Sequence, residues 1–238
     1  MDLSGIDLIV FDKDGTLIDF HAMWSGWTEA TVDALEVATG RPLRGPLFTM
    51  LGYDPDVGRA HARGALIATP MARLRDLTAE VLIDEGLTPQ AAESALRQAW
   101  HAPDPVTLAH PLTDLPALLA AQRSAGRRTA IATSDDRLPT ERTLIALGID
   151  GLFDATVCAD DGITAKPAAD MVAHLCRACG VPPGRTAVVG DSPADMAMGR
   201  AAGAGLVLGV LTGIGTRADL LAADRIVDSV EALLPGPG

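Results

Sequence analysis

Residues 8–20 read LIVFDKDGTLIDF, and this stretch decides how the rest of the chain is interpreted. Four apolar residues, Leu8 to Phe11, predict a buried strand that runs directly into two carboxylates, Asp12 and Asp14, placed two residues apart. A charge at the edge of a hydrophobic core costs free energy unless a partner compensates it. The stretch therefore indicates either a tight turn at Asp14-Gly15 or a site that binds a cation.

The composition of the 238-residue chain indicates a globular protein with a sizeable aliphatic core. Hydrophobic residues make up 48% of the sequence and aromatic residues only 3%. The net charge of −12 argues against nucleic acid and an anionic membrane surface as partners, because both would repel the protein. The first apolar run is too short for a signal peptide or a membrane span, and three scattered cysteines are typical of a reducing compartment. We therefore expect a cytoplasmic protein.

From about residue 110 onward, short apolar strands alternate with helices that end at glycine. The expected strands are residues 129–132, 155–158, 186–189 and 206–210, and the expected helices are 113–124, 140–147, 170–179 and 192–202. Continuous apolar strands separated by helices are typical of a parallel sheet that is covered on both faces. Residues 6–11 are expected to belong to the same sheet.

Residues 20–109 interrupt this alternation. The sequence predicts only helices here, over residues 24–39, 71–85 and 88–100, with no clear period between residues 46 and 64. We therefore predict two domains. Residues 1–19 and 110–238 form an α/β core, and residues 20–109 form a smaller helical domain inserted after the first strand.

Polar side chains follow the expected strands at their carboxyl ends, which is where ligands bind in open parallel sheets. They are Asp12 and Asp14 after the first strand, Thr133 and Ser134 after the second, Lys166 in the loop after the third, and Asp191 and Asp195 after the fourth. Each has an ordinary explanation when taken alone: Asp195 would complement a helix dipole, and Lys166 would be a solvated loop lysine. Their coincidence at one edge of a sheet indicates a site.

These four loops resemble the four motifs of the haloacid dehalogenase (HAD) superfamily. DKDGT at residues 12–16 matches the pattern Asp-x-Asp-x-Thr, and Thr133, Lys166-Pro167 and the stretch VGDSPADMAMGRAAG at 189–203 follow in the order of the remaining motifs. The inserted helices resemble the cap of the phosphoglycolate phosphatase and β-phosphoglucomutase branch. The resemblance implies an α/β fold with a HAD-like Rossmannoid parallel sheet and a helical C1-type cap after the first strand.

The activity implied by the resemblance is that of a phosphatase that depends on Mg²⁺ and hydrolyses small phosphomonoesters, such as phosphoglycolate, through an aspartyl-phosphate. Asp12 is then the nucleophile and Asp14 the general acid and base. A carboxylate nucleophile is already ionised at pH 7, and Mg²⁺ is a hard cation that takes oxygen ligands. The implied Mg²⁺ ligands are the Asp12 carboxylate, the Asp14 backbone carbonyl and Asp191. Asp195 would hold these ligands in place without binding the ion itself.

The remaining motif residues are expected to bind the phosphate group of the substrate. Lys166 would supply a fixed positive charge, the Thr133 hydroxyl a hydrogen bond and the Ser134 backbone a further donor. Lys166 and Thr133 thereby belong to the catalytic set. The acid at position 14 favours phosphate esters, because relatives that resemble haloacid dehalogenases lack it and need no proton for an alkoxide.

Two other functions use similar residues. A sugar phosphomutase of the β-phosphoglucomutase type would share all four motifs, so the core sequence does not separate it from a phosphatase. A phospho-aspartate receiver domain also carries acids, a Thr or Ser and a Lys, but it pairs its acids consecutively and has no inserted domain. Arg59, Arg63 and Arg73 either recognise a substrate carboxylate or lie on the surface. The substrate and the oligomeric state stay open.

Overall fold

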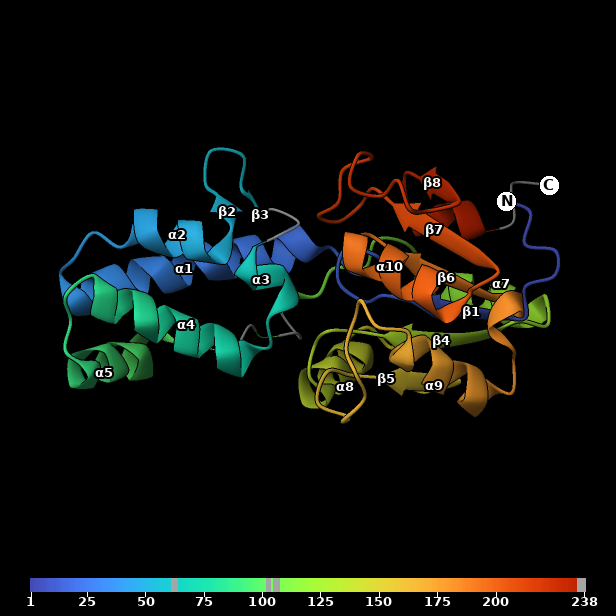
Figure 1. Ribbon diagram of the computed structural model, residues 1–238, viewed down its shortest axis with the longest axis horizontal. Helices are drawn as coiled ribbons and strands as arrows, with labels where there is room; N and C mark the ends of the chain where they lie inside the picture. The colour runs from blue at the N-terminus through green and yellow to red at the C-terminus, as the bar shows by residue number, and fades with distance from the viewer. Residues whose placement is uncertain (61–63, 102–103, 105–107, 235–238) are drawn as a thin grey trace. The chain divides into compact units, whose positions relative to one another are not determined.

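Six parallel strands form the sheet of the first unit, in the order β5-β4-β1-β6-β7-β8 (Figure 1). The strands are β1 (Leu8–Phe11), β4 (Arg128–Ala132), β5 (Ala155–Val157), β6 (Thr186–Gly190), β7 (Leu206–Val210) and β8 (Arg225–Val227). The computed structural model describes residues 1–60, 64–101, 104 and 108–234. Its chain divides into two units, Met1–Phe20 with Pro105–Gly238, and His21–Asp104.

Strand β1 lies in the middle of the sheet and sets the level at which its neighbours end. Phe11, the last residue of β1, is paired with Ile131 of β4 on one side and with Val189 of β6 on the other. All four residues of β1 are buried, as expected for a strand that is covered on both faces. Because the three strands are parallel and in register, the loops that follow them begin at one edge of the sheet.

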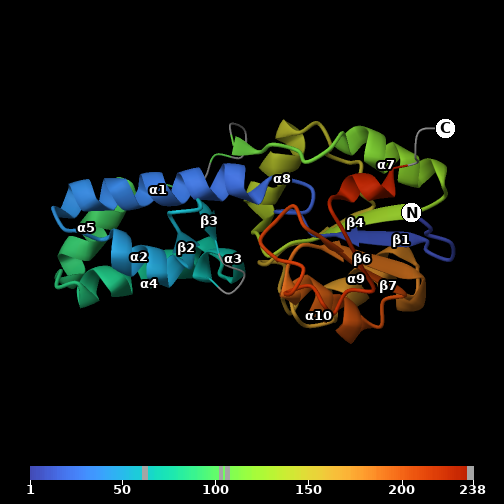
Figure 2. The ribbon, with the colours of Figure 1, turned by 90° about the horizontal axis from the view of Figure 1, so that it is seen from above.

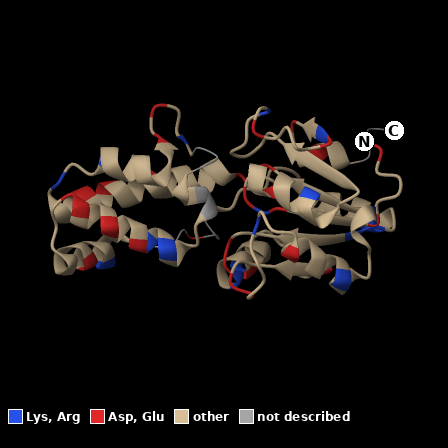
Figure 3. Cartoon of the chain, in the orientation of Figure 1, with Lys and Arg blue, Asp and Glu red and all other residues tan. Residues whose placement is uncertain are grey.

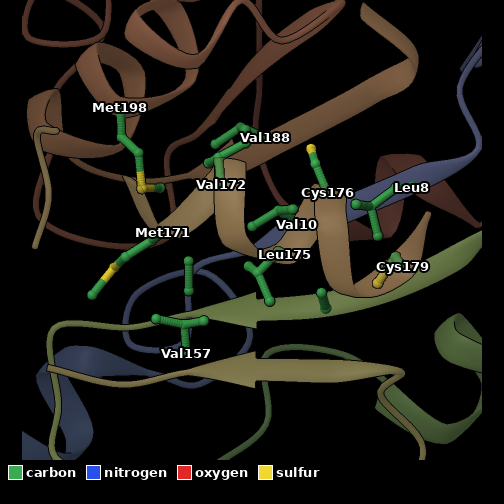
Figure 4. Close-up of a cluster of buried hydrophobic side chains, with 12 residues drawn as sticks. Leu8, Val10, Val157, Met171, Val172, Leu175, Cys176, Cys179, Val188 and Met198 are labelled. Atoms are coloured by element: carbon green, nitrogen blue, oxygen red, sulfur yellow. The ribbon is translucent and has the colours of Figure 1, made fainter. Parts of the chain in front are cut away.

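Helices cover both faces of this sheet (Figure 2). Helix α7 (Leu115–Ser124) lies on one face, and α9 (Asp170–Cys179) and α10 (Pro193–Ala202) lie on the other. The face below α9 and α10 contains a buried cluster of Leu8, Val10, Ala130, Ala132, Val157, Met171, Val172, Leu175, Cys176, Cys179, Val188 and Met198 (Figure 4). The side chains at 171, 172, 175, 176 and 179 recur at helical spacing, so α9 buries one continuous apolar stripe.

The second unit contains the helices α1 (Phe20–Thr39), α2 (Arg44–Leu51), α3 (Ala65–Ala68), α4 (Met71–Asp84) and α5 (Pro89–Ala99). The expectation of helices alone was wrong, because β2 (Tyr53–Asp54) and β3 (Arg59–Ala60) form a short antiparallel pair. The turn chemistry of the connecting residues explains it. Asp54 accepts a hydrogen bond from the backbone of Asp56 at 2.9 Å, and Gly58 has a φ of 64°.

The segments that leave and re-enter the first unit run side by side within it. The backbone N–H of Asp19 donates to the carbonyl of His110 at 2.8 Å, and that of Leu112 donates to Leu17 at 2.9 Å. The two segments that connect the first unit to the inserted helices are therefore hydrogen-bonded to each other directly after the DKDGT loop. Their point of insertion matches the helical cap expected from the sequence.

Two expected elements agree with the structure to the residue, the helix over 170–179 and the strand over 206–210. Asp114 is the N-cap of α7, where it accepts from the Ala117 backbone at 2.9 Å. Strand β8 was not predicted, because its three residues begin with an arginine and give too short a pattern.

Charged side chains of both signs lie on the helices of each unit, with acidic residues along α1 and α4 (Figure 3). Cys158, Cys176 and Cys179 are buried free thiols. Within the part of the chain that the structure describes, no helix combines the length and the apolar character that crossing a membrane requires.

The core below α9 provides a test of the fold. Leu175 is fully buried in this cluster, so Leu175→Ala is expected to lower the free energy of unfolding by about 2–5 kcal/mol through lost apolar contact and a residual cavity. Leu138, which is 62% exposed, provides the control: Leu138→Ala should change the free energy of unfolding by less than about 0.5 kcal/mol. Denaturant unfolding of the two variants makes the comparison, and equal effects would contradict the assigned packing.

Candidate active site

Two buried aspartates lie at the carboxyl ends of the central strands. Asp12 follows β1 and is 9% exposed, and Asp191 follows β6 and is 2% exposed. The register of β1 and β6 explains their proximity, because each residue lies just beyond the paired positions Phe11 and Val189. The prediction that motifs far apart in the sequence meet at this edge of the sheet is confirmed for these two residues.

Lys166 connects this pair of strands to the helix that follows β6. Its ammonium lies 2.5 Å from a carboxylate oxygen of Asp12 and 2.6 Å from one of Asp195. The side chains of Lys166 and Asp195 are 4% and 1% exposed, so this lysine is not the solvated loop residue of its ordinary interpretation. Burial alone would lower its pKa, but the two carboxylates raise the pKa of Lys166 above its usual value.

Asp195 has two structural roles at once. One oxygen accepts from Lys166, while the other accepts from the backbone N–H of Ser192 at 3.1 Å and from its hydroxyl at 2.5 Å. The Ser192 hydroxyl in turn accepts from the Asp195 backbone at 3.2 Å, which completes a capping box at the start of α10. Asp195 therefore takes part both in the cap of α10 and in the buried cluster around Lys166, and both of its oxygens have hydrogen-bond partners.

Asp191 is held by residues from two other loops. The Thr16 hydroxyl donates to one carboxylate oxygen at 3.3 Å, and the Ile214 backbone N–H donates to the other at 2.9 Å. Glycine is required around it, because a Cβ at Gly15 would lie 2.5 Å from the carboxylate and a Cβ at Gly213 would overlap it. The loop after β7 thus lies in direct contact with the Asp191 side chain.

The charges in this cluster do not balance. Asp12, Asp191 and Asp195 present three carboxylates to the single ammonium of Lys166, which leaves an excess of two negative charges if all are ionised. Burial raises the pKa of Asp12 to about 6, with Lys166 opposing the shift and the charges of Asp195 and Asp14 adding to it. Burial and the neighbouring charges of Asp12 and Asp195 raise the pKa of Asp191 well above its usual value. Ionised carboxylates in this place need a further cation.

The donor set fits a divalent metal ion. Carboxylate oxygens of Asp12, Asp191 and Asp195 lie within 4.8 Å of one another. Hard oxygen donors and an excess of two negative charges match the preferences of Mg²⁺. All three carboxylates offer oxygen donors to such an ion, and one oxygen of Asp195 also orients Lys166 beside it.

The Asp14 carboxylate belongs to a second buried cluster that the sequence analysis missed. The Lys13 ammonium lies 2.7 Å from Asp14 and 3.3 Å from Asp135, and the Lys13 side chain is 1% exposed. Burial alone would lower the pKa of Lys13, but the charges of Asp14 and Asp135 outweigh it and raise that pKa above its usual value. Burial raises the pKa of Asp135, although the nearby Lys13 ammonium opposes the shift. Lys13 and Lys166 are the only lysines in the sequence, which was a signal available before the structure.

The other predicted residues lie at the same edge. Thr133 directly follows β4 and is buried, with its hydroxyl accepting from the Asp135 backbone at 3.1 Å, and Ser134 is half-buried beside it. The Thr133 backbone N–H donates to Val157 of β5 at 3.0 Å. These contacts hold the start of the loop after β4 against the end of β5.

Two of the three arginines that were candidates for recognising a substrate carboxylate lie within the described residues. Arg73 pairs with Glu80 at 2.8 Å on the surface of α4, which agrees with its interpretation as a surface residue. Arg59 is exposed on β3, and Arg63 lies outside the described residues. Both described arginines are therefore exposed, and Arg73 is in addition held by an ion pair.

Residues 212–215 are a part of the site that only the structure reveals. The Thr212 hydroxyl donates to the Gly15 carbonyl at 2.7 Å, and the Gly215 N–H donates to the Asp191 carbonyl at 3.0 Å. A Cβ at Gly215 would overlap that carbonyl. The only signal in the sequence is the close spacing of two glycines, which by itself is common in loops.

The contact of Gly213 with Asp191 is directly testable. Gly213→Ala is expected to lower the free energy of unfolding by about 1–3 kcal/mol through overpacking, and to weaken divalent-metal binding because Asp191 must move. Gly184→Ala is the control, since a Cβ there meets nothing within 4 Å. Isothermal titration with Mg²⁺ and denaturant unfolding measure both effects, and wild-type values for Gly213→Ala would show that the loop does not constrain Asp191.

Comparison with known proteins agrees with this geometry. A family profile of haloacid dehalogenase-like hydrolases matches residues 6–203. A phosphoglycolate phosphatase of Cupriavidus necator is 36% identical over 117 residues, which are 48% of this chain and only 50% of that protein. A phosphoglycolate phosphatase of Rhodospirillum rubrum is 29% identical over 84% of this chain and 78% of that protein.

A solved structure shows that the likeness of fold extends along the whole chain. The crystal structure of a predicted phosphoglycolate phosphatase from Haemophilus somnus 129PT covers 98% of this chain and 98% of its own, with a TM-score of 0.68 at 21% identity. The match includes the parallel sheet and the helices inserted after β1. Sequence family, fold and buried acidic cluster agree, and the chain belongs to the haloacid dehalogenase-like hydrolase family.

Proposed function

We propose that this hydrolase is a Mg²⁺-dependent phosphatase of small phosphomonoesters, with phosphoglycolate-like esters as its substrate class. The observation that carries the proposal is the buried cluster of Asp12, Lys166 and Asp191, in which a carboxylate nucleophile adjoins both a fixed ammonium and an excess of negative charge. The relatives named as phosphoglycolate phosphatases support the same activity.

In the first step, Asp12 attacks the phosphorus atom of the ester. A new bond forms between the Asp12 carboxylate oxygen and phosphorus as the bond to the ester oxygen breaks, which leaves an aspartyl-phosphate. Lys166 balances negative charge on the phosphate oxygens, and Thr133 and Ser134 offer hydrogen bonds from the adjacent loop. The position of Lys166 against Asp12 supports this assignment.

Asp14 handles the protons of both steps. It donates a proton to the alkoxide that leaves in the first step. In the second step it takes a proton from a water molecule, whose oxygen attacks phosphorus and breaks the bond to Asp12, releasing inorganic phosphate. The Asp14 carboxylate is suited to this role because it lies outside the cluster of Asp12, Asp191 and Asp195 and pairs with Lys13 instead.

Asp12, Asp191 and the backbone carbonyl of Asp14 would hold the metal, with Asp195 as a supporting residue. Mg²⁺ in this place supplies Lewis-acid charge that offsets the negative phosphate and the two carboxylates. Thr16 and Ile214 orient Asp191 for that task through the hydrogen bonds that they donate to it. The same arrangement accounts for the raised pKa values of Asp12 and Asp191 without the ion.

The role of Asp12 is tested by phosphate release from a panel of phosphomonoesters that includes phosphoglycolate and hexose phosphates. We expect Asp12→Asn to lower turnover at least about a thousandfold, because an amide cannot form the aspartyl-phosphate, while the fold is retained. Asp170→Asn, at an exposed aspartate in the first turn of α9, is the matched control and should retain turnover within about twofold.

Two other outcomes of this phosphate-release assay would contradict the proposed function. Substantial metal-dependent turnover by purified Asp12→Asn would show that the nucleophile is wrongly assigned. Absence of phosphate release by wild type from every ester would instead favour a sugar phosphomutase, and the isomerisation of a sugar phosphate primed with its bisphosphate would then be measured.

The metal site has a test that does not depend on activity. Saturating Mg²⁺ is expected to raise the unfolding midpoint of wild type by about 2–8 °C, because the ion binds only the folded chain and relieves the repulsion between Asp12 and Asp191. Asp191→Asn should lose this response, and EDTA should reverse it in wild type. An unchanged Mg²⁺ response in Asp191→Asn would contradict the assigned ligand.

A further inference from the structure

Lys13 occupies the position of the DKDGT loop between the two aspartates that the proposed function employs. Its side chain is almost fully buried, and its only companion lysine in the whole sequence, Lys166, lies in the other buried cluster of the site. All remaining cationic side chains are arginines. A buried ammonium is costly unless it is paired, so its place beside Asp14 needs an explanation.

The contact with Asp14 holds the carboxylate by both of its oxygens. The Lys13 ammonium lies 2.7 Å from Oδ1 and also 2.7 Å from Oδ2 of Asp14. The backbone of the loop is equally constrained, since the N–H groups of Leu17 and Ile18 both donate to the Lys13 carbonyl, at 2.9 and 3.1 Å. Rotation of the Asp14 carboxylate would therefore require breaking a buried ion pair.

Asp135 fixes the ammonium from the opposite side. Its Oδ2 lies 3.3 Å from Lys13, while its Oδ1 accepts from the Asp136 backbone at 2.9 Å. The Asp135 carbonyl accepts from the Ala159 N–H at 2.9 Å, so this residue is itself anchored to the loop after β5. The side chain of Lys13 thus has a position that does not depend on Asp14.

We propose that Lys13 is a positioning residue that aims the Asp14 carboxyl group at the leaving-group oxygen and keeps it from turning towards the metal ligands Asp12 and Asp191. The inference rests on the proposed function, in which Asp14 donates a proton to the alkoxide. A free carboxylate would be attracted by charge to a divalent cation held by Asp12 and Asp191. Lys13, anchored by Asp135, supplies the competing attraction.

The test uses the dependence of the proton donor on the leaving group. An alkyl phosphate needs a proton on its leaving oxygen, whereas p-nitrophenolate is stable enough to leave without one. Lys13→Met keeps the length of the side chain and removes its charge. We expect kcat for phosphoglycolate to fall about 10–100-fold with KM within about twofold, and kcat for p-nitrophenyl phosphate to fall less than about threefold.

A matched variant separates positioning from general disturbance of the loop. Arg137, the first residue of α8 (Arg137–Ala146), binds Asp161 in the loop after β5 at 2.5 Å and 2.8 Å and lies outside the cluster of Lys13, Asp14 and Asp135. Arg137→Met should therefore affect both esters by the same factor. Equal losses on both esters in Lys13→Met would overturn the proposal. Phosphate release by wild type tests the proposed function separately, so the two can fail independently.

A second measurement covers the case in which Lys13→Met does not fold. Because the chain has two lysines, protein labelled with ¹⁵N on the lysine side chains should show two ammonium signals. We expect both signals to be protected from exchange with solvent and one of them to shift in Asp14→Asn. A Lys13 signal that exchanges freely, or that is unchanged in Asp14→Asn, would refute the contact on which the inference depends.

Discussion

The excess of buried negative charge at the edge of the sheet is the constraint on which the rest of this structure depends. Asp12, Asp191 and Asp195 face one ammonium, that of Lys166, in surroundings where an unpaired charge is expensive. The fold stabilises each carboxylate separately, with a capping box at Asp195 and donors at Asp191. The charge that remains uncompensated when all three carboxylates are ionised is two negative units, which a divalent cation would neutralise.

The parallel sheet makes this concentration of charge possible. Strands β4, β1 and β6 are mostly apolar and buried, with polar side chains only at the first residues of β4 and β6, so their burial contributes stability. Their aligned register brings three loops to the same level, and the loop after β7 closes over Asp191 with glycines at its closest approaches. Stability therefore lies in the layers of the sheet and its helices, and function lies in the loops at one edge.

The two lysines divide the site into two buried ion clusters with different roles. Lys166 joins Asp12 to Asp195 and leaves the cluster short of positive charge, which favours the binding of a divalent cation. Lys13 joins Asp14 to Asp135 and keeps the Asp14 carboxylate apart from the first cluster. In the proposed mechanism, this separation lets two carboxylates only two residues apart in sequence take different roles, Asp12 as the nucleophile and Asp14 as the proton carrier.

The sequence by itself determined the alternation of strands and helices, the insertion after the first strand and the edge at which Asp12, Lys166 and Asp191 meet, because these follow from local hydrophobic periodicity and from parallel connectivity. Only the tertiary structure decided the partners of Lys13 and the closure of residues 212–215 over Asp191. Neighbouring side chains in an extended chain point to opposite sides, so the pairing of Lys13 with Asp14 depends on the turn at Gly15. Contacts of this kind join residues that no local pattern connects, and they exist only once the strands are in register.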